Sequence, residues 1–288
     1  MTTLGTPARD AERSTGLLLV FVLVSFSANS LITRHVSADD LLDAGLLTIV
    51  RFAAGAVALV AIAVLAGERI VVGRRNLIPA LWLGIYAVAI SYGYQYIGAA
   101  AGTFVFYATV LLTLVITDLV RRETVGRRRL LGAATALLGI AVLAVGSVED
   151  VTVRGVVLLA MTGAAWGLYT RAGRTQDDPR IATTGHFVVL SAALVVIGLA
   201  LAVPASDVRI TTTGLVWGIA MGAGTTALAY VAWYACQRNL TATSAGTVQL
   251  AIPVLTAIGA VLLLGESFGP ELGVAAALVG VGLWAARP

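Results

Sequence analysis

Long apolar runs follow one another along the whole chain and are separated by short polar segments. A transmembrane helix needs about 20 consecutive apolar residues, and the pattern predicts ten such spans. Their approximate bounds are residues 16–34, 44–66, 77–97, 99–119, 129–147, 153–171, 182–203, 213–236, 242–264 and 270–286. The boundary between the third and fourth spans is the weakest, because residues 97–102 join them without a charge. The remaining loops are too short for a soluble domain, so we expect an all-α membrane protein.

The composition of the 288 residues agrees with lipid as the main solvent. Hydrophobic residues make up 59% and charged residues 12%, against about 45–50% and about 25% in soluble domains. This composition excludes a disordered chain, a disulfide-rich secreted domain and an ordinary cytosolic enzyme. The net charge of +4 comes with no basic patch on a soluble fold, so no nucleic-acid partner is expected. The single cysteine, Cys236, allows no intrachain disulfide and no cysteine-based metal site.

The arginines predict the orientation of the chain, because cytoplasmic loops carry an excess of basic residues. There is no lysine, and with the N-terminus inside, fifteen of the 19 arginines lie on the cytoplasmic side. Only Arg34, Arg154 and Arg209 lie outside, and Arg51 lies within a span. This bias places both termini in the cytoplasm of a bacterial inner membrane. A cleaved signal peptide is the alternative for the first span, but cleavage would leave nine spans and break the repeat described next.

A weak internal repeat relates the two halves of the chain. Four pairs of segments match in the same order: 31–34 with 168–171, Arg51-Phe52 with His186-Phe187, 101–103 with 245–247, and 130–141 with 271–282. The repeat divides the chain into residues 1–147 and 148–288, with five spans in each half. Because five is odd, the second half enters the membrane in the opposite sense. Such inverted repeats are common in secondary transporters, which bind substrate near the membrane midplane.

The sequence resembles the drug/metabolite transporter superfamily in its EamA-type branch. The resemblance is carried by residues 228–266, with Pro253-Val254 and Gly265-Glu266, by Trp166-Gly167 and by Arg51-Phe52. The first half is more diverged and has no proline that matches Pro253. The resemblance implies ten helices, both termini inside and export of small molecules. Chain length and the aromatic-rich third span are similar to those of aromatic amino-acid exporters in that superfamily.

Polar side chains inside a bilayer are costly and therefore need an interior-facing role. Six of them are candidate substrate-binding residues: Gln249, Trp166, Tyr86, Tyr92, Asn29 and Tyr107. The Gln249 amide has two donors and an acceptor that need partners in hydrocarbon, and Pro253 frees backbone groups one turn later. Gln249 and Asn29 can instead link two helices, and Trp166 can face lipid or core. For Tyr94 and Tyr96, an interfacial aromatic belt is the favoured interpretation.

Two basic residues inside predicted spans have both a chemical and a structural interpretation. Arg51 can receive a substrate carboxylate, but we expect snorkelling or a structural hydrogen bond, because the resemblance places an arginine here whatever the substrate. His186 aligns with Arg51 in the other half. It can carry protons, but a satisfied interior histidine is the expected role.

The acidic residues narrow the substrate class. No Asp or Glu lies in the central part of a predicted span, and Asp118, Glu266 and Glu271 lie at span ends, where helix-terminal or interfacial roles are expected. A proton-coupled exporter of cations usually needs a central carboxylate. Motifs for nucleotide binding, zinc hydrolysis or a serine nucleophile are absent from the sequence, so no enzyme activity, cofactor or metal is expected.

The sequence therefore predicts an inner-membrane exporter of small metabolites. The expected substrates are amino acids, including aromatic ones, and the expected mechanism is alternating access. Its partners would be the substrate and membrane lipid, and a monomer is compatible with the sequence. Two alternatives stay open: a multidrug or cationic-compound exporter of the same fold, and a non-transporting membrane scaffold or channel.

Overall fold

A computed structural model describes residues 6–97, 99–123, 126–145, 152–173, 176–202, 208–237, 240–264 and 269–285 of the chain. The helices are α1 (Thr6–Ala38), α2 (Ala44–Leu65), α3 (Arg74–Gly93), α4 (Ala99–Val120), α5 (Arg127–Val145), α6 (Val153–Gly173), α7 (Pro179–Ala202), α8 (Thr212–Ala220), the π-helix η1 (Met221–Leu228), α9 (Ala229–Gln237), α10 (Ala242–Gln249), α11 (Ala251–Leu264) and α12 (Glu271–Ala285). In these residues the only extended pairing is a single bridge between Leu42 and Ile210. The prediction of an all-α fold is therefore confirmed for the described part of the chain.

Seven helical stretches among the described residues are long and apolar enough to cross a membrane. They are Thr15–Ser37, Ala44–Leu65, Arg74–Gly93, Val153–Gly173, Pro179–Leu199, Thr212–Gln237 and Ser244–Leu263, and three shorter apolar helices accompany them at Val105–Val120, Leu130–Val142 and Glu271–Ala285. The arrangement as ten spans in two inverted halves stays a prediction.

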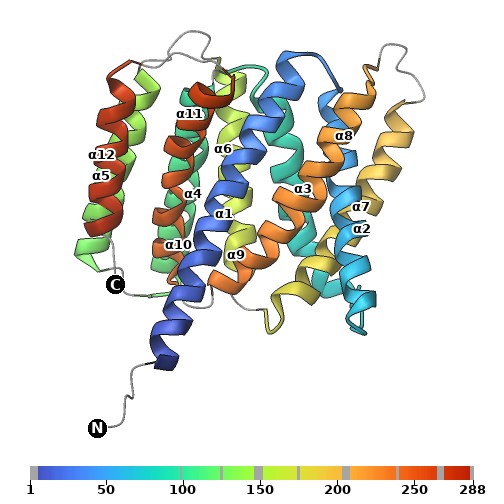
Figure 1. Ribbon diagram of the computed structural model, residues 1–288, viewed down its shortest axis with the longest axis horizontal. Coiled ribbons are helices and arrows are strands. Elements are labelled where there is room, and N and C mark those ends of the chain that lie inside the picture. The colour runs from blue at the N-terminus through green and yellow to red at the C-terminus, as the bar shows by residue number, and fades with distance from the viewer. Residues whose placement is uncertain are drawn as a thin grey trace.

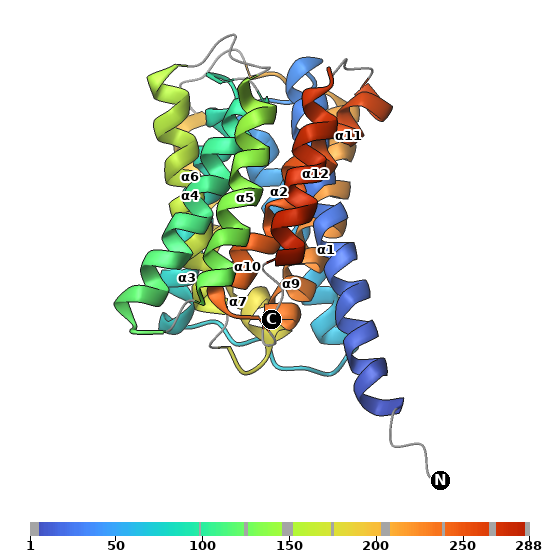
Figure 2. The same ribbon diagram turned by 90° about the vertical axis from the view of Figure 1, so that its left-hand side faces the viewer.

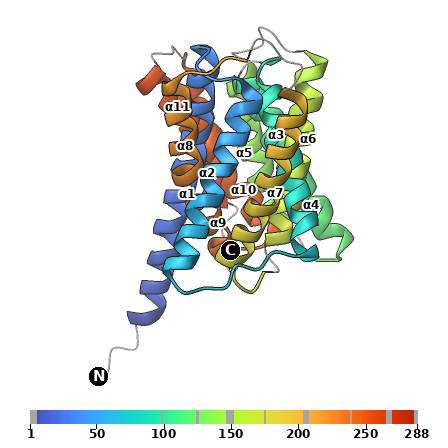
Figure 3. The ribbon, with the colours of Figure 1, turned by 90° about the vertical axis from the view of Figure 1, so that its right-hand side faces the viewer.

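The helices run side by side in one bundle (Figure 1). We call the end where α1 begins and α12 ends the terminal end, at the bottom of Figure 1, and the opposite end the distal end. Helices α5 and α12 pack on one another at one side of the bundle (Figure 2). The other side is formed by α2, α3, α7 and α8 (Figure 3).

Local sequence signals explain where several helices begin and break. The Asp43 carboxylate accepts the backbone N–H groups of Gly45 and Leu46 and so caps α2. Thr211 caps α8 in the same way. Helix α10 ends at Gln249, four residues before Pro253, because a proline ring clashes with the carbonyl four positions earlier and has no N–H to bond it.

A glycine allows the close contact between α2 and the π-helix at the centre of the bundle. A Cβ atom built on Gly222 would lie 2.1 Å from the backbone oxygen of Arg51. Only a residue without a side chain fits here, so α2 and η1 touch through their backbones. This contact holds Arg51 against Thr226, which lies one turn further along η1.

Candidate functional site

A small cavity lies in the distal half of the bundle. Its lining consists of Phe26, Asn29, Ser30 and Thr33 of α1, Arg51 of α2, Tyr86, Ile90 and Tyr94 at α3, Phe106 and Tyr107 of α4, Trp166 of α6 and Tyr230 of α9. The cavity has a volume of about 20 Å³, which is room for about one water molecule. A metabolite can therefore enter only if the side chains or helices around the cavity move.

The most strongly polar group in this lining is the guanidinium of Arg51, whose side chain is only 4% exposed. Its Nε donates to the Thr226 hydroxyl at 2.8 Å, and its Nη2 makes longer contacts with the hydroxyls of Tyr86 (3.4 Å) and Tyr230 (3.3 Å). Within the described residues, Arg51 forms no ion pair with a carboxylate. Among the described residues, the cavity thus holds a cation without a carboxylate beside it.

Asn29 holds Thr226, the nearest hydrogen-bond partner of Arg51, in place. Its Oδ1 accepts hydrogen bonds from the hydroxyls of Thr225 (2.6 Å) and Thr226 (3.1 Å), and its Nδ2 donates to the Thr225 carbonyl at 2.8 Å. Both threonines belong to η1, and π-helical turns occur frequently at functional sites. The hydrogen bonds run from α1 through η1 to α2, so Asn29 both lines the cavity and links helices.

Aromatic rings form the floor of the cavity on the terminal side. The Trp166 ring lies 5.0 Å from those of Tyr86 and Tyr230, measured between centroids, and 5.5 Å from that of Phe26 in an edge-to-face arrangement. Tyr107 stacks beside Phe106 in the same lining, with centroids 4.3 Å apart. These rings offer a stacking surface next to the guanidinium.

Gln249 supports the floor from below and is fully buried. Its Oε1 accepts the indole N–H of Trp166 at 2.5 Å, and its Nε2 donates to the Ala245 carbonyl at 3.1 Å. It is absent from the lining of this cavity as packed. In this conformation its amide holds Trp166 across α6 and α10.

Replacing Gln249 with alanine is expected to reduce substrate affinity severalfold while the protein still folds. The substitution leaves the indole N–H of Trp166 without its acceptor, and a buried donor without a partner costs about 1–3 kcal/mol. Trp166→Phe in the same background removes that donor and should restore part of the loss. Equal substrate affinity of Gln249→Ala and the unaltered protein, measured as substrate binding in detergent, would contradict the role of Gln249 in holding Trp166.

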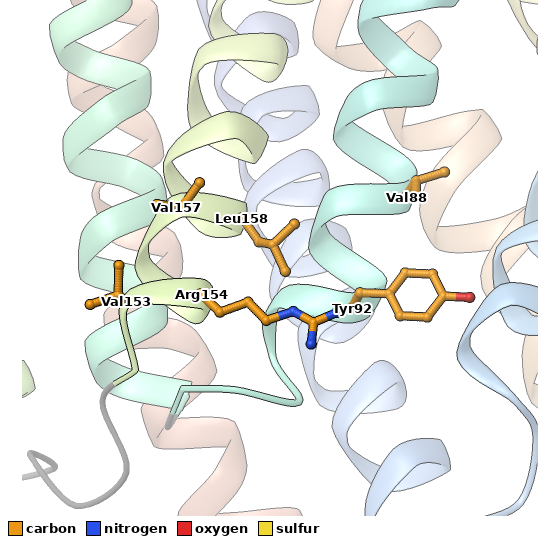
Figure 4. A pocket seen from close by; sticks show the side chains of 6 residues that line it. All are labelled: Val88, Tyr92, Val153, Arg154, Val157 and Leu158. Atoms are coloured by element: carbon orange, nitrogen blue, oxygen red, sulfur yellow. The ribbon is translucent and has the colours of Figure 1, made fainter.

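Tyr92 lies apart from the other candidate residues. Its side chain is 38% exposed and lines an open pocket between α3 and α6 with Val88, Val153, Arg154, Val157 and Leu158 (Figure 4). Five of the six sequence candidates therefore gather at the central cavity and its floor, and Tyr92 does not.

The two tyrosines expected at an interfacial belt are placed differently. Tyr96 contacts the guanidinium of Arg154, which lies 4.2 Å from its ring centroid at the distal end. Tyr94 instead lines the cavity and shares a hydrogen bond with Thr103 at 3.1 Å.

Ion pairs and packed rings close the bundle at the terminal end. Arg171 binds Asp118 at 2.9 Å and Glu123 at 2.5 Å, and Arg180 pairs with Glu68. Between these pairs and the cavity lies a layer of buried side chains: Tyr169, His186, Trp233 and Tyr234. Both sets of ion pairs join the first half of the sequence to the second.

Two of the acidic residues predicted at span ends lie near the ends of their helices. Asp118 lies near the end of α4 and binds Arg171, and Glu271 accepts the Gly269 N–H at the start of α12. Glu266 lies outside the described residues.

Arg51, Phe26 and Tyr230 line the cavity as well. From the sequence, Arg51 can receive a carboxylate or make a structural hydrogen bond, the latter being the expected role, and Phe26 and Tyr230 are not among the candidates. A usable signal is the Thr225-Thr226 pair followed four residues later by Tyr230, because that spacing places Thr226 and Tyr230 on one helix face toward Arg51.

Two known proteins are similar to this chain in sequence, and a solved structure is similar to it in fold. The chain is 34% identical over 261 residues to the uncharacterized protein PA1977 of Pseudomonas aeruginosa, covering 91% of this chain and 90% of that protein. It is 26% identical over 200 residues to the uncharacterized transporter YyaM of Bacillus subtilis, covering 64% of this chain and 65% of that protein. A crystal structure with 21% identity superposes with a TM-score of 0.78 over 95% of this chain and 97% of its own, and shows the fold alone.

The EamA-like transporter family matches two successive parts of the chain, residues 14–145 and 153–286. Together these parts cover nearly all of the sequence, and they agree with the bundle of membrane-spanning helices. The chain is a multi-span membrane protein and belongs to the EamA-like transporter family.

Proposed function

We propose that this chain exports small metabolites that carry a carboxylate and an apolar or aromatic group, with aromatic amino acids as the main class. The observation that carries the proposal is the guanidinium of Arg51, which has no carboxylate partner among the described residues and lies among the rings of Tyr86, Trp166 and Tyr230. A guanidinium binds a carboxylate through two parallel hydrogen bonds, and aromatic faces stack on an apolar side chain. The hydroxyls of Ser30 and Thr33 offer oxygens to an ammonium group.

Alternating access between two inverted five-helix halves is the proposed mechanism. The tandem family match supports the division into residues 1–147 and 148–288. The packing supports it as well: α1 contacts α9 and η1 as α6 contacts α3, and α1 contacts α11 as α6 contacts α4. The cavity lies toward the distal end while ion pairs close the terminal end. If the distal end closed and the terminal end opened, and the reverse, the substrate would move across the membrane.

The cavity argues against the cation exporter. A cationic drug needs an acidic partner, and the described residues of the lining include Arg51 but no Asp or Glu. Two like charges in a site of low dielectric repel one another. A scaffold or channel remains distinguishable by experiment, because neither shows saturable, substrate-specific flux.

Counterflow in proteoliposomes tests the function. Vesicles preloaded with tryptophan should accumulate radiolabelled tryptophan, and excess phenylalanine or tyrosine should compete. Tryptamine, which lacks the carboxylate, should compete poorly. Counterflow of an organic cation without counterflow of any amino acid would overturn the proposal in favour of the multidrug alternative.

Transport should continue without an imposed proton gradient. The described parts of the membrane-spanning helices place no carboxylate in the cavity that could exchange a proton for substrate. Tryptophan efflux from loaded vesicles should therefore run down its own gradient at equal internal and external pH. If efflux vanished without a pH gradient, and His186→Gln removed that dependence, uncoupled transport would be disproved.

The terminal end is proposed to face the cytoplasm of a bacterial inner membrane. Gly126 is exposed there and directly precedes α5, and Arg121, Arg122 and Arg127 are close to it in the sequence. A cysteine at Gly126, in a chain with Cys236→Ser, should resist an impermeant maleimide added to intact cells and react after the cells are opened. Rapid labelling in intact cells would reverse the orientation.

A further inference from the structure

We propose that His186 is the counterpart of Arg51 and contacts the substrate when the bundle opens at the terminal end. The proposal rests on the alternating access described above. It identifies a substrate-contacting residue in the conformation that the present arrangement does not display.

The two residues occupy equivalent places in helices α2 and α7. Arg51 is the eighth residue of α2, counted from its distal start at Ala44, and His186 is the eighth residue of α7, counted from its terminal start at Pro179. At a rise of 1.5 Å per residue, each lies about 10 Å from its own end of the bundle. The helices run in opposite directions, so the same position faces opposite ends.

The neighbouring side chains repeat the correspondence. Thr48 and Thr183 each lie one turn before the basic residue, and each hydroxyl donates to the carbonyl of the first residue of its helix, at 2.9 Å to Ala44 and 2.6 Å to Pro179. The same hydrogen bond at the same position in both helices shows that their first turns are built alike.

Phe52 follows Arg51 and Phe187 follows His186, and these two phenylalanines meet where the two halves of the chain contact one another. Phe52 and Phe187 are both fully buried, and their ring centroids are 5.2 Å apart. Residues on a two-fold axis contact their own counterparts, so a two-fold relation between α2 and α7 would produce this contact. Under that relation Arg51 and His186 would exchange places.

The surroundings of His186 are those of a closed site. Its Nδ1 lies 3.3 Å from the Tyr169 hydroxyl, and its ring lies edge-on to those of Tyr169 and Tyr234. Arg51 likewise lies beside tyrosine hydroxyls, those of Tyr86 and Tyr230. When the ion pairs of Arg171 and Arg180 separate, Tyr169 and Tyr234 would part and leave the imidazole facing the opening. An imidazole N–H can then donate to the carboxylate that Arg51 releases.

Cysteine accessibility tests the proposal without knowledge of the substrate. In the Cys236→Ser background, His186→Cys should react with an impermeant maleimide applied to the terminal side and not to the distal side. Ala136→Cys is the matched buried control, because Ala136 is fully buried and in contact with α12. Gly126→Cys reports that reagent has reached the terminal side. We expect His186→Cys to react at least tenfold faster than Ala136→Cys.

Equal, slow labelling of His186→Cys and Ala136→Cys, with rapid labelling of Gly126→Cys, would overturn the proposal. Should His186→Cys fail to express, Thr183→Cys reports on the same helix face one turn nearer the terminal end.

A second measurement tests whether His186 makes a polar contact with the substrate. His186→Gln should keep tryptophan counterflow within about threefold, and His186→Phe should reduce it more than tenfold at equal yield. Equal counterflow in both would contradict a polar contact. Absence of tryptophan counterflow in the unaltered protein would refute the proposed substrate and leave the labelling test valid.

Discussion

Replacing Arg51 with glutamine is expected to raise the KM for tryptophan about ten- to hundredfold. A hydrogen bond to a charged group contributes about 1.5–3 kcal/mol, and each 1.4 kcal/mol corresponds to a factor of ten. Of the cavity-lining residues that the structure describes, Arg51 alone carries a positive charge, so none of the others can take over the carboxylate. Arg51→Lys keeps the charge without the planar pair of donors and should give an intermediate KM.

Folding should not suffer from this substitution. Arg51 is buried and has no carboxylate partner in the described part of the chain, and a buried charge without an ion-pair partner is itself costly. The melting temperature of Arg51→Gln in detergent should therefore equal or exceed that of the unaltered protein. Arg154→Gln is the matched control, because Arg154 lies at the distal surface beside Tyr96 and outside the cavity. An unchanged KM in Arg51→Gln would show that Arg51 does not receive the carboxylate.

Replacing Gly222 with alanine is expected to destabilise the bundle and to impair transport together. The new Cβ would lie 2.1 Å from the Arg51 backbone oxygen and 2.9 Å from its carbonyl carbon, and a backbone cannot rotate away as a side chain does. Overpacking of this kind costs about 1–3 kcal/mol, sometimes more. Because α2 and η1 would move apart, the hydrogen bond between Arg51 and Thr226 should lengthen as well.

Gly224 is the control for this experiment. It lies two residues later in the same π-helix, and a Cβ there would meet nothing within 4 Å. Gly224→Ala should therefore unfold at the same denaturant concentration as the unaltered protein, while Gly222→Ala unfolds earlier. Equal midpoints for the two variants would show that the contact between α2 and η1 can relax at no cost.

The sequence by itself determined the all-helical membrane fold and the position of most helices. A run of about 20 apolar residues can be stable in lipid only if its own backbone is satisfied within the segment, as in a helix. This is a local property, so it can be read from the chain one segment at a time. The break after Gln249 is local in the same sense, because Pro253 acts on a carbonyl four residues away.

The tertiary structure alone decided which polar side chains meet. Tyr86 and Tyr92 lie six residues apart on α3 and, at 3.6 residues per turn, face different directions, so one lines the cavity and the other an open pocket. Gln249 lies beneath Trp166 because α10 packs beside α6. The partners of Arg51 come from α3, η1 and α9. Such contacts depend on how each helix is rotated against its neighbours, and that rotation is set by packing between distant segments rather than by the hydropathy of any one of them.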